Sequence, residues 1–455
     1  MEYGVLSIIP PLIAISFAII SKEVVISLFL GLFVGYFIIE KAFFLAFYNS
    51  FESIIDLFQE SWITKTIIFA LLVGSLMKLI EHSGGVQGFI KYVSEQKSII
   101  KSKRDVLFLG YFLGLIIFIE SSITSLISGR VMKNFSSKFP ISNEKIAYIS
   151  DSTSAPVCAL IPLNSWGALL SSLIASQIAI LSLNENSIDM LINSLLFNFY
   201  SIITLLFVFF IIYSNKDFFG MKKAEEAIQH NFEKIENQTK SKSSIYMIIP
   251  IISLIVCMIV FLYITGNGNI LKGSGSTSVF YSVIVSIFVA FLLYIPTKIY
   301  TLKEFFSRFY EGIGEMIPVT LILILAFALG ELTKELQSGE FLAQILKDSI
   351  SPFMLPALIF FIGAIISFAT GTSWGTFAIL MPIAMQSGFE LDVNLYLCIG
   401  AVISGGVFGD HCSVISDTTI ISSLSADCDH MSHVNTQLPY AIICGIFSFV
   451  LFLLF

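Results

Sequence analysis

Two short stretches of this chain place an acidic residue among hydroxyl side chains inside apolar surroundings. Residues 149–153 read Ile-Ser-Asp-Ser-Thr, and residues 415–419 repeat them as Ile-Ser-Asp-Thr-Thr. A carboxylate inside a membrane costs on the order of several kcal/mol and usually marks the path of an ion. Carboxylate and hydroxyl oxygens are ligands for hard cations such as Na+, and they suit soft metals less well. The chemistry predicted for these stretches is therefore the binding of a cation.

A further carboxylate precedes the second stretch. Asp410 and Asp417 are seven residues apart, so on a continuous helix they would share one face about 10 Å apart, and a break would change that spacing. Burial raises the pKa of a carboxylate, so H+ and Na+ can compete for the same group. We expect Na+ to be bound by the carboxylates of Asp151, Asp410 and Asp417, beside the hydroxyl groups of Thr418 and Thr419.

The first acidic stretch continues into a segment that cannot form an undisturbed helix. Residues 149–167 contain Pro156 and Pro162, and each proline removes an intrahelical hydrogen bond and crowds the preceding turn. In lipid, the freed carbonyls must find partners within the protein. We therefore expect a broken helix near the middle of the membrane; the alternative is a proline kink packed on small residues. The polar side chains expected to bind at the break are those of Ser152, Thr153 and Asn164.

Residues 105–135 predict a helical hairpin that enters and leaves the membrane on one side. Basic residues flank both of its ends, at 101–104 and at 130–133, and such residues mark the cytoplasmic side. Glu120 lies at the expected tip. Its carboxylate is the candidate proton carrier or a charge that balances Arg130, and the alternative is a structural ion pair.

Residues 353–388 predict a second hairpin, with the sequence Gly-Thr-Ser-Trp-Gly-Thr at residues 371–376 of its tip. Such a turn presents backbone N–H and hydroxyl groups near the middle of the membrane. It is able to hold the carboxylate of an organic solute against helix N-termini. The hydroxyl side chains expected at this tip are those of Thr372, Ser373 and Thr376.

Cysteine and histidine residues near the end of the chain offer a different kind of site. Cys428, His430 and His433 follow His411 and Cys412. The paired Cys-x-x-Cys spacing of a zinc site is missing. We therefore expect a polar helix end here, and we predict no cofactor.

The composition of the chain indicates the kind of protein in which these residues lie. Of the 455 residues, 56% are hydrophobic and 13% are charged, and the mean hydropathy is +0.88. This leaves too little polar surface for a soluble protein of this length. Stretches long enough to cross the hydrocarbon core recur along the chain. The sequence thus predicts an all-α polytopic membrane protein in a lipid bilayer, without a nucleic-acid partner.

The chain is predicted to consist of two repeats. The lysine-rich residues 215–244 form a cytoplasmic linker between a first repeat, residues 1–214, and a second, residues 245–455. Each repeat is expected to contain about five spans, one re-entrant hairpin and one broken helix, and an odd number of crossings inverts the second repeat. Apart from the hairpins, the segments expected to cross are residues 4–20, 24–43, 62–80, 145–182, 188–213, 245–266, 276–297, 317–337, 393–428 and 434–455.

Six short motifs together carry a resemblance to a known family, and they lie at residues 151–157, 161–167, 371–376, 409–419, 428–430 and 436–440. They resemble the NhaC family of bacterial Na+/H+ antiporters. The resemblance implies inverted repeats with two re-entrant hairpins and two broken helices, in a homodimer of the bacterial inner membrane whose transport domain moves against a scaffold. Cys412 and Val414 stand where serine and proline are expected, a difference that would alter the helix geometry near Asp410.

The predicted function is secondary active transport, the export of Na+ in exchange for H+ by alternating access. The alternative left open is Na+- or H+-coupled transport of a small organic acid of the malate or lactate type, or of an amino acid, because the family's relatives include such exchangers. A channel would let ions follow the membrane potential without coupling. Enzymatic activity is disfavoured because the sequence shows no catalytic triad, phosphate loop or metal-ligand spacing.

Overall fold

In the computed structural model of the chain, all regular secondary structure among the described residues is helical. Residues 229–242 of the linker, Ile119 beside the expected tip of the first hairpin and Ile415 of the repeated acidic stretch are among the predicted features that lie outside these residues. The described residues are 3–21, 23–95, 100–118, 120–136, 139–228, 243–269, 273–338, 341, 351–414 and 416–455.

The described helices fall into those before the linker and those within and after it. Before the linker lie η1 (Gly4–Ile8), α1 (Ile9–Ser21), α2 (Val24–Glu40), α3 (Phe43–Leu57), α4 (Ser61–His82), α5 (Gly85–Glu95), α6 (Lys103–Ile116), α7 (Ser121–Ser136), α8 (Asn143–Ser152), α9 (Ala155–Cys158), α10 (Ser165–Ile180), α11 (Ser187–Ser194), η2 (Leu195–Phe197) and α12 (Phe199–Ser214). The linker and the second half contain α13 (Phe219–Ile228), α14 (Ile245–Thr265), α15 (Gly275–Tyr294), α16 (Leu302–Glu335), η4 (Pro352–Met354), α18 (Leu355–Thr370), α19 (Ser373–Glu390), α20 (Leu395–Cys412), α21 (Asp417–Ala426) and α22 (His430–Phe452).

Many of these helices are suited to a membrane. In the described part of the chain, eight are long and apolar enough to cross one. Large apolar side chains such as Phe44, Leu292 and Phe447 are exposed on the bundle, as expected where the surrounding solvent is lipid. The prediction of an all-helical polytopic membrane protein is confirmed. The eight helical segments cover residues 61–82, 199–228, 245–265, 275–294, 302–335, 352–370, 395–412 and 430–452. The segment 199–228 joins α12 to α13, and the segment 352–370 joins η4 to α18.

Three helices, α3, α5 and α13, were absent from the sequence prediction. In α3, polar residues such as Asn49 and Asp56 interrupt the apolar run at helical spacing, which makes the helix amphipathic rather than a continuous apolar span. The span predicted at residues 317–337 is also longer than expected. A capping box formed by Thr301 and Glu304 starts α16 well before that segment.

Pairs of adjacent helices occupy both predicted hairpin segments, whose re-entry into the membrane stays a prediction, and both predicted helix interruptions are present among the described residues. α6 and α7 form the first hairpin, and α18 and α19 form the second, which turns at Gly371 with a left-handed φ of 69°, a conformation that glycine adopts without strain. The short α9 separates α8 from α10, where the two prolines predict a break. Residues 413–416 separate α20 from α21.

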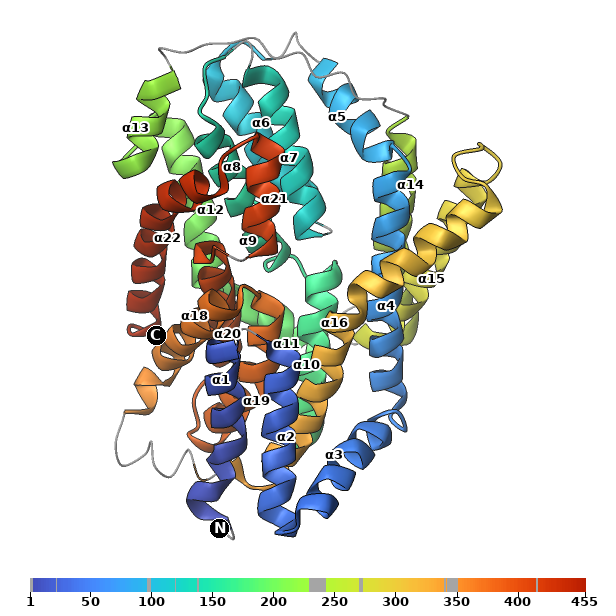
Figure 1. The fold of residues 1–455 in the computed structure, drawn as a ribbon, viewed down its shortest axis with the longest axis vertical. Helices are drawn as coiled ribbons and strands as arrows, with labels where there is room; N and C mark the ends of the chain where they lie inside the picture. Colours follow the sequence, from blue (N-terminus) through green and yellow to red (C-terminus); the bar gives the residue numbers. More distant parts are fainter. Residues whose placement is uncertain are drawn as a thin grey trace.

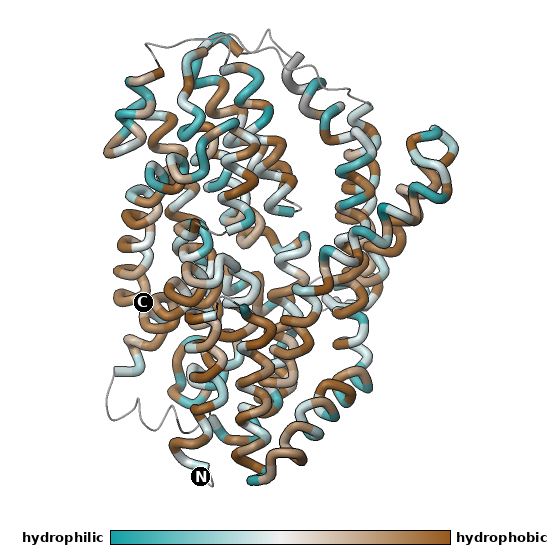
Figure 2. Tube along the Cα trace, in the orientation of Figure 1, coloured by the Kyte–Doolittle hydropathy of each residue, from teal (hydrophilic) through white to brown (hydrophobic). Residues whose placement is uncertain are grey.

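The arrangement of the helices brings the two interruptions to a similar level. Figure 1 shows α6, α7, α8 and α21 together in the upper part, and α1, α2, α10, α18, α19 and α20 in the lower part. α21 belongs to the second half of the chain but packs against α7 and α8 of the first. Hydrophilic residues gather toward the upper end, whereas the lower helices are mostly hydrophobic (Figure 2). Each interrupted helix therefore runs from one group to the other, and its break lies between them.

Candidate functional site

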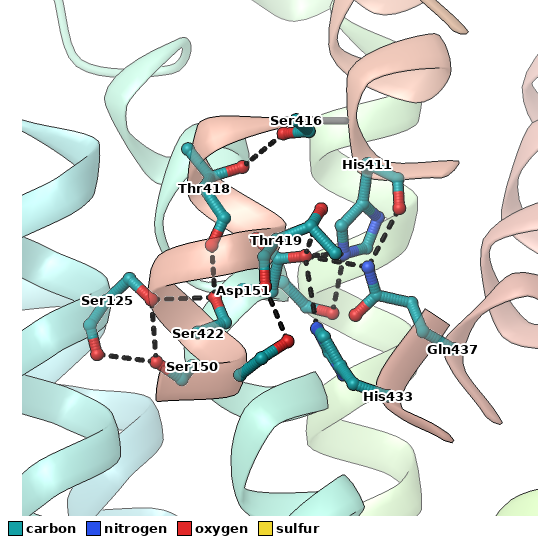
Figure 3. Close-up of polar contacts among 12 residues, drawn as sticks. Ser125, Ser150, Asp151, His411, Ser416, Thr418, Thr419, Ser422, His433 and Gln437 are labelled. Carbon is teal, nitrogen blue, oxygen red and sulfur yellow. Dashed lines mark hydrogen bonds and ion pairs between the residues drawn. The ribbon is translucent and has the colours of Figure 1, made fainter. Parts of the chain in front are cut away.

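Asp151 lies at the centre of a buried polar cluster (Figure 3). It belongs to the last turn of α8, and its side chain is fully buried. Its Oδ2 accepts hydrogen bonds from Gln437 Nε2 of α22 at 2.7 Å and from Thr419 Oγ1 of α21 at 3.1 Å. Three helices therefore meet at one carboxylate, and both donors come from the other half of the chain.

Two histidines lie beside the same carboxylate. Nε2 of His433 is 3.6 Å from Oδ2 of Asp151, and Nε2 of His411 is 3.9 Å from it. The ring nitrogens of His411 contact Tyr200 OH at 2.7 Å and Ser152 Oγ at 3.1 Å. Among the described residues, neither ring nitrogen of His433 nor Oδ1 of Asp151 has a hydrogen-bond partner. Buried polar atoms rarely stay unpaired, so this cluster is a candidate for function.

Two asparagines hold the break between α8 and α10. Asn164 is the N-cap of α10, and its Nδ2 donates to the carbonyls of Phe118 at 2.7 Å and Cys158 at 2.9 Å. Asn198 donates to the carbonyl of Ala159 at 3.3 Å. Carbonyl groups at the break thus have protein partners, as lipid surroundings require. Sequence reasoning identified Asn164 but missed Asn198.

The hydroxyl groups predicted at this break are buried and form hydrogen bonds within the protein. Ser152 contacts His411, and Thr153 Oγ1 donates to the carbonyl of Ile149 at 2.7 Å. Both side chains are fully buried. The contacts described here are with protein groups, so the role of Ser152 and Thr153 in binding stays a prediction.

Asp410, near the end of α20, is a second buried carboxylate and lies against the tip of the second hairpin. Its Oδ2 accepts a hydrogen bond from Ser373 Oγ at 2.6 Å, and its buried Oδ1 has no partner among the described residues. Ser373 Oγ also lies 3.3 Å from the carbonyl of Gly406. A Cβ at Gly409 would lie 2.2 Å from the carbonyl of Ala364. Glycine is therefore required at this position for α20 to pack against α18.

Asp417 does not share a helix with Asp410. α20 ends before residues 413–416, and Asp417 is the first residue of α21, where the helix dipole favours an acidic side chain. Asp417 is exposed, whereas Asp151 and Asp410 are buried. The charge of Asp410 nevertheless interacts with those of Asp417 and Asp151. The three predicted carboxylates thus lie in one region, but in unlike surroundings.

The acidic tip of the first hairpin binds the start of α7. Glu120 is half-buried, and its carboxylate accepts from Ile123 N at 2.9 Å and from Ser121 Oγ at 3.2 Å. Arg130 instead lies 3.9 Å from Asp427. The expectation that Glu120 balances Arg130 is therefore wrong, because ten residues of helix correspond to a rise of about 15 Å.

The N-termini of α10 and α19 lie close together. Both begin with Ser-Trp-Gly, at residues 165–167 and 373–375, and the rings of Trp166 and Trp374 meet with their centroids 6.1 Å apart at an interplanar angle of 87°. Thr372 is the N-cap of α19. Because helix N-termini attract negative charge, this pair offers a place for a solute carboxylate.

The remaining predicted threonines differ in what they contact. Thr376 Oγ1 donates to the carbonyl of Thr372 at 3.0 Å. Thr418 Oγ1 lies 3.1 Å from Ser416 Oγ. These contacts are local to one turn, whereas Thr419 reaches across to Asp151 of the other half.

The histidines expected at a polar helix end are divided in the structure. His411 and His433 are buried beside Asp151, so the expectation is wrong for them, whereas His430 begins α22. His430 contacts Ser423 Oγ at 3.0 Å and the carbonyl of Val414 at 2.7 Å. Among the described residues, no group of three or more His, Cys, Asp or Glu side chains is arranged to hold a metal ion. A cation bound at a single carboxylate would therefore need hydroxyl or backbone oxygens to complete its shell.

Comparison with known sequences decides the class of protein. Residues 157–455 match the model of the family described as the Na+/H+ antiporter family. The chain belongs to the Na+/H+ antiporter family. This member of the family is a multi-pass membrane protein and a secondary transporter, not an enzyme. The resemblance inferred from its motifs is confirmed.

Relatives of this antiporter family member differ in how much of the chain they match. An uncharacterized protein of Haemophilus influenzae is 33% identical over 460 residues, which cover 96% of this chain and 88% of that protein. The malate-2H+/Na+-lactate antiporter of Bacillus subtilis is 32% identical over 173 residues, which cover 37% of this chain and 36% of that protein. The first similarity extends over nearly the whole chain, and the second over a part of it.

A solved transporter has a similar fold. The crystal structure of the YdaH transporter from Alcanivorax borkumensis matches with a TM-score of 0.61 and covers 90% of this chain and 88% of that chain. The sequence identity is 12%. At this identity the similarity concerns the fold and not the transported solute.

Sequence reasoning did not place Gln437, His433 or Tyr200 beside Asp151 in this family member. It expected His433 at a polar helix end and named residues 436–440 only as part of a family motif. Gln437 and His433 are one turn apart on α22, and polar residues spaced by four on an apolar helix share one face. That spacing was the available signal. Tyr200 carried no such signal, since its contact with His411 is made between helices far apart in the sequence.

Proposed function

We propose that this transporter exchanges Na+ for H+ by alternating access and that its carboxylates bind the transported ions. The observation that carries the proposal is Asp151. It is fully buried, accepts hydrogen bonds from two helices of the other half, and has an Oδ1 without a partner among the described residues. Such a carboxylate can bind either a cation or a proton, and competition between them couples the two fluxes.

Asp410 and Asp417 complete the proposed cation site. Asp410 supplies a second buried carboxylate with an unpaired oxygen among the described residues, and Asp417 supplies an exposed one at the start of α21. The electrostatic interactions among the three carboxylates support one shared region. We assign Na+ to Asp151, Asp410 and Asp417, with Thr418 and Thr419 contributing hydroxyl oxygens.

Glu120 is the proposed proton carrier. It is half-buried at the first hairpin tip, and its charge interacts with that of Asp417. A proton that arrives at Glu120 would weaken the repulsion between the two carboxylates. Loading of the proton and binding of the cation would thereby be linked.

The proposed architecture is a pair of inverted repeats, residues 1–214 and 245–455, joined by a cytoplasmic linker at residues 215–244. The order of elements supports it, because the hairpin α6–α7 and the interrupted α8–α10 are followed in the second half by the hairpin α18–α19 and the interrupted α20–α21. The two hairpins also lie in opposite parts of the bundle (Figure 1). We further propose a homodimer in the bacterial cytoplasmic membrane.

A second candidate function is the coupled transport of a small organic acid or an amino acid. It is favoured by the paired N-termini of α10 and α19 and by the similarity of part of the chain to the malate-2H+/Na+-lactate antiporter. In that case Na+ or H+ would bind at the carboxylates and the solute at the tips. The side chains assigned to the solute are those of Ser152, Thr153, Asn164, Thr372, Ser373 and Thr376.

Proton flux in proteoliposomes separates the two functions. Vesicles with an acidic lumen would receive Na+, Li+, K+, malate, lactate or single amino acids from outside. Dissipation of the pH gradient by Na+ or Li+ alone supports cation/proton antiport. Flux that appears only with an organic solute would contradict it and support the second candidate.

A further inference from the structure

The described part of the linker forms polar contacts with α8, the helix that carries Asp151, and with α22. Asp217 accepts a hydrogen bond from Lys145 Nζ of α8 at 2.7 Å, and the Lys145 side chain is fully buried. The next residue, Phe218, donates its backbone N–H to Tyr440 OH of α22 at 2.8 Å. Two consecutive linker residues therefore hold α8 and α22 at the same time.

The linker helix α13 adds a second attachment. Glu225 is 7% exposed, and its Oε1 accepts from both Ser142 N and Ser142 Oγ at 2.7 Å. Its Oε2 forms an ion pair with Lys103 at the start of α6. Met221, on the same helix, is fully buried. The attachment thus reaches the N-cap of α8 and the first helix of the first hairpin.

These contacts lie close to the Asp151 cluster. Lys145 precedes Asp151 by six residues on α8, a rise of about 9 Å, and Tyr440 follows Gln437 by less than one turn of α22. Asp151 and Gln437 form the 2.7 Å hydrogen bond at the centre of the cluster. The linker is therefore hydrogen-bonded to both α8 and α22, the helices whose side chains form the Asp151–Gln437 hydrogen bond.

A flexible connection between two repeats would not need buried charges. Burial of a charged group is unfavourable unless it is paired, and removal of one partner leaves the other uncompensated. Glu226, the neighbour of Glu225, shows the ordinary case, since it and Lys222 are both 64% exposed and 3.9 Å apart. An exposed pair of this kind contributes little.

We infer that Asp217 and Glu225 are positioning residues for transport. Asp217 binds α8 while the adjoining Phe218 binds α22, and Glu225 binds the N-cap of α8. Together these contacts hold α8 and α22 at the spacing at which Gln437 binds Asp151, and they thereby set the apparent affinity for the transported ion. This inference rests on the proposed function for its assignment of Na+ as that ion. It makes residues 217–225 a structural part of the unit that contains α8 and α22, rather than a passive connection between the repeats.

The test compares Asp217→Asn and Glu225→Gln with the matched control Glu226→Gln in proteoliposomes. Asp217→Asn and Glu225→Gln are expected to raise the half-saturating Na+ concentration about five- to tenfold, an effect within the range known for residues that act on a binding site through packed helices. The control Glu226→Gln is expected to match the parent. Asp217→Glu keeps the charge and is expected to restore most of the affinity. Thermal unfolding of each purified variant is measured in parallel.

A lower unfolding temperature with an unchanged half-saturating concentration would overturn the inference, because the contacts would then be structural only. If Asp217→Asn does not fold, Tyr440→Phe removes the hydroxyl that Phe218 contacts at little structural cost. An unchanged half-saturating concentration in Tyr440→Phe would then overturn the inference, and a raised one would support it. If an organic solute, and not Na+, drives flux in the parent, the proposed Na+/H+ exchange is wrong, but the positioning role of Asp217 and Glu225 is not yet contradicted. The same comparison, made with that solute, then decides the positioning role.

Discussion

Asp151 of α8 accepts a hydrogen bond of 2.7 Å from Gln437 of α22 inside a fully buried cluster. The two residues come from opposite halves of the chain. Gln437 also donates to the carbonyl of His411 at 2.8 Å, close to the break that follows α20. One amide thus connects the last turn of α8 with the end of α20.

Gln437→Leu is expected to weaken binding of the transported ion about fivefold, because the Asp151 carboxylate loses a buried donor and must reorganise. The half-saturating Na+ concentration for proton flux measures this. Asn435→Ala is the matched control, since Asn435 lies on the same helix and is exposed. An equal shift in both variants would contradict a direct role for Gln437.

Ser373→Ala is expected to change the half-saturating concentration of the transported ion about threefold or more, because the Asp410 carboxylate loses its 2.6 Å donor. Thr372→Ala removes only the cap of α19 and is expected to cost about 1 kcal/mol of stability. Flux assays and thermal unfolding on both variants separate the effects. A larger transport effect from Thr372→Ala would favour binding of an organic solute at the tip.

Asn164→Ala is expected to destabilise the protein by roughly 2–4 kcal/mol, because α10 loses its cap and two buried carbonyls lose their donor. Thermal unfolding of the purified protein in detergent measures the change. Unfolding at the parent temperature would show that Phe118 and Cys158 do not depend on this amide.

Gly409→Ala is expected to disrupt the packing of α20 on α18, because a Cβ there would lie 2.2 Å from the Ala364 carbonyl. Gly314→Ala on α16 is the control, since a Cβ there meets no atom within 4 Å, and it should stabilise the helix by up to about 1 kcal/mol. The yield of folded protein and its unfolding temperature report both effects. Similar behaviour of the two variants would contradict the described helix contact.

The sequence predicted local features better than contacts between distant segments. The break after Asp151 was predictable because Pro156 and Pro162 exclude a regular helix, and the second hairpin was predictable from its glycine-rich tip. The separation of Asp410 from Asp417 was left open, since the glycines before residues 413–416 permit a break without requiring one.

The partners of Asp151 could not be predicted for a different reason. Thr419 and Gln437 reach it only because α21 and α22 pack on α8, and no local pattern encodes which helices meet. The same holds for Lys145 and Asp217, whose buried pair makes part of the linker a structural element. From the hydrophilic sequence of residues 215–244 alone, only a linker between the two repeats could be predicted.

The most direct test of Na+/H+ exchange at Asp151 is proton flux driven by Na+ in proteoliposomes that contain the parent or Asp151→Asn. The parent is expected to dissipate an inside-acid pH gradient when Na+ is added. Asp151→Asn, shown to be folded by its unfolding transition, is expected to be slower by about 100-fold, roughly 2.7 kcal/mol. Exchange by Asp151→Asn at the parent rate would contradict the assignment of this carboxylate to the transported ions.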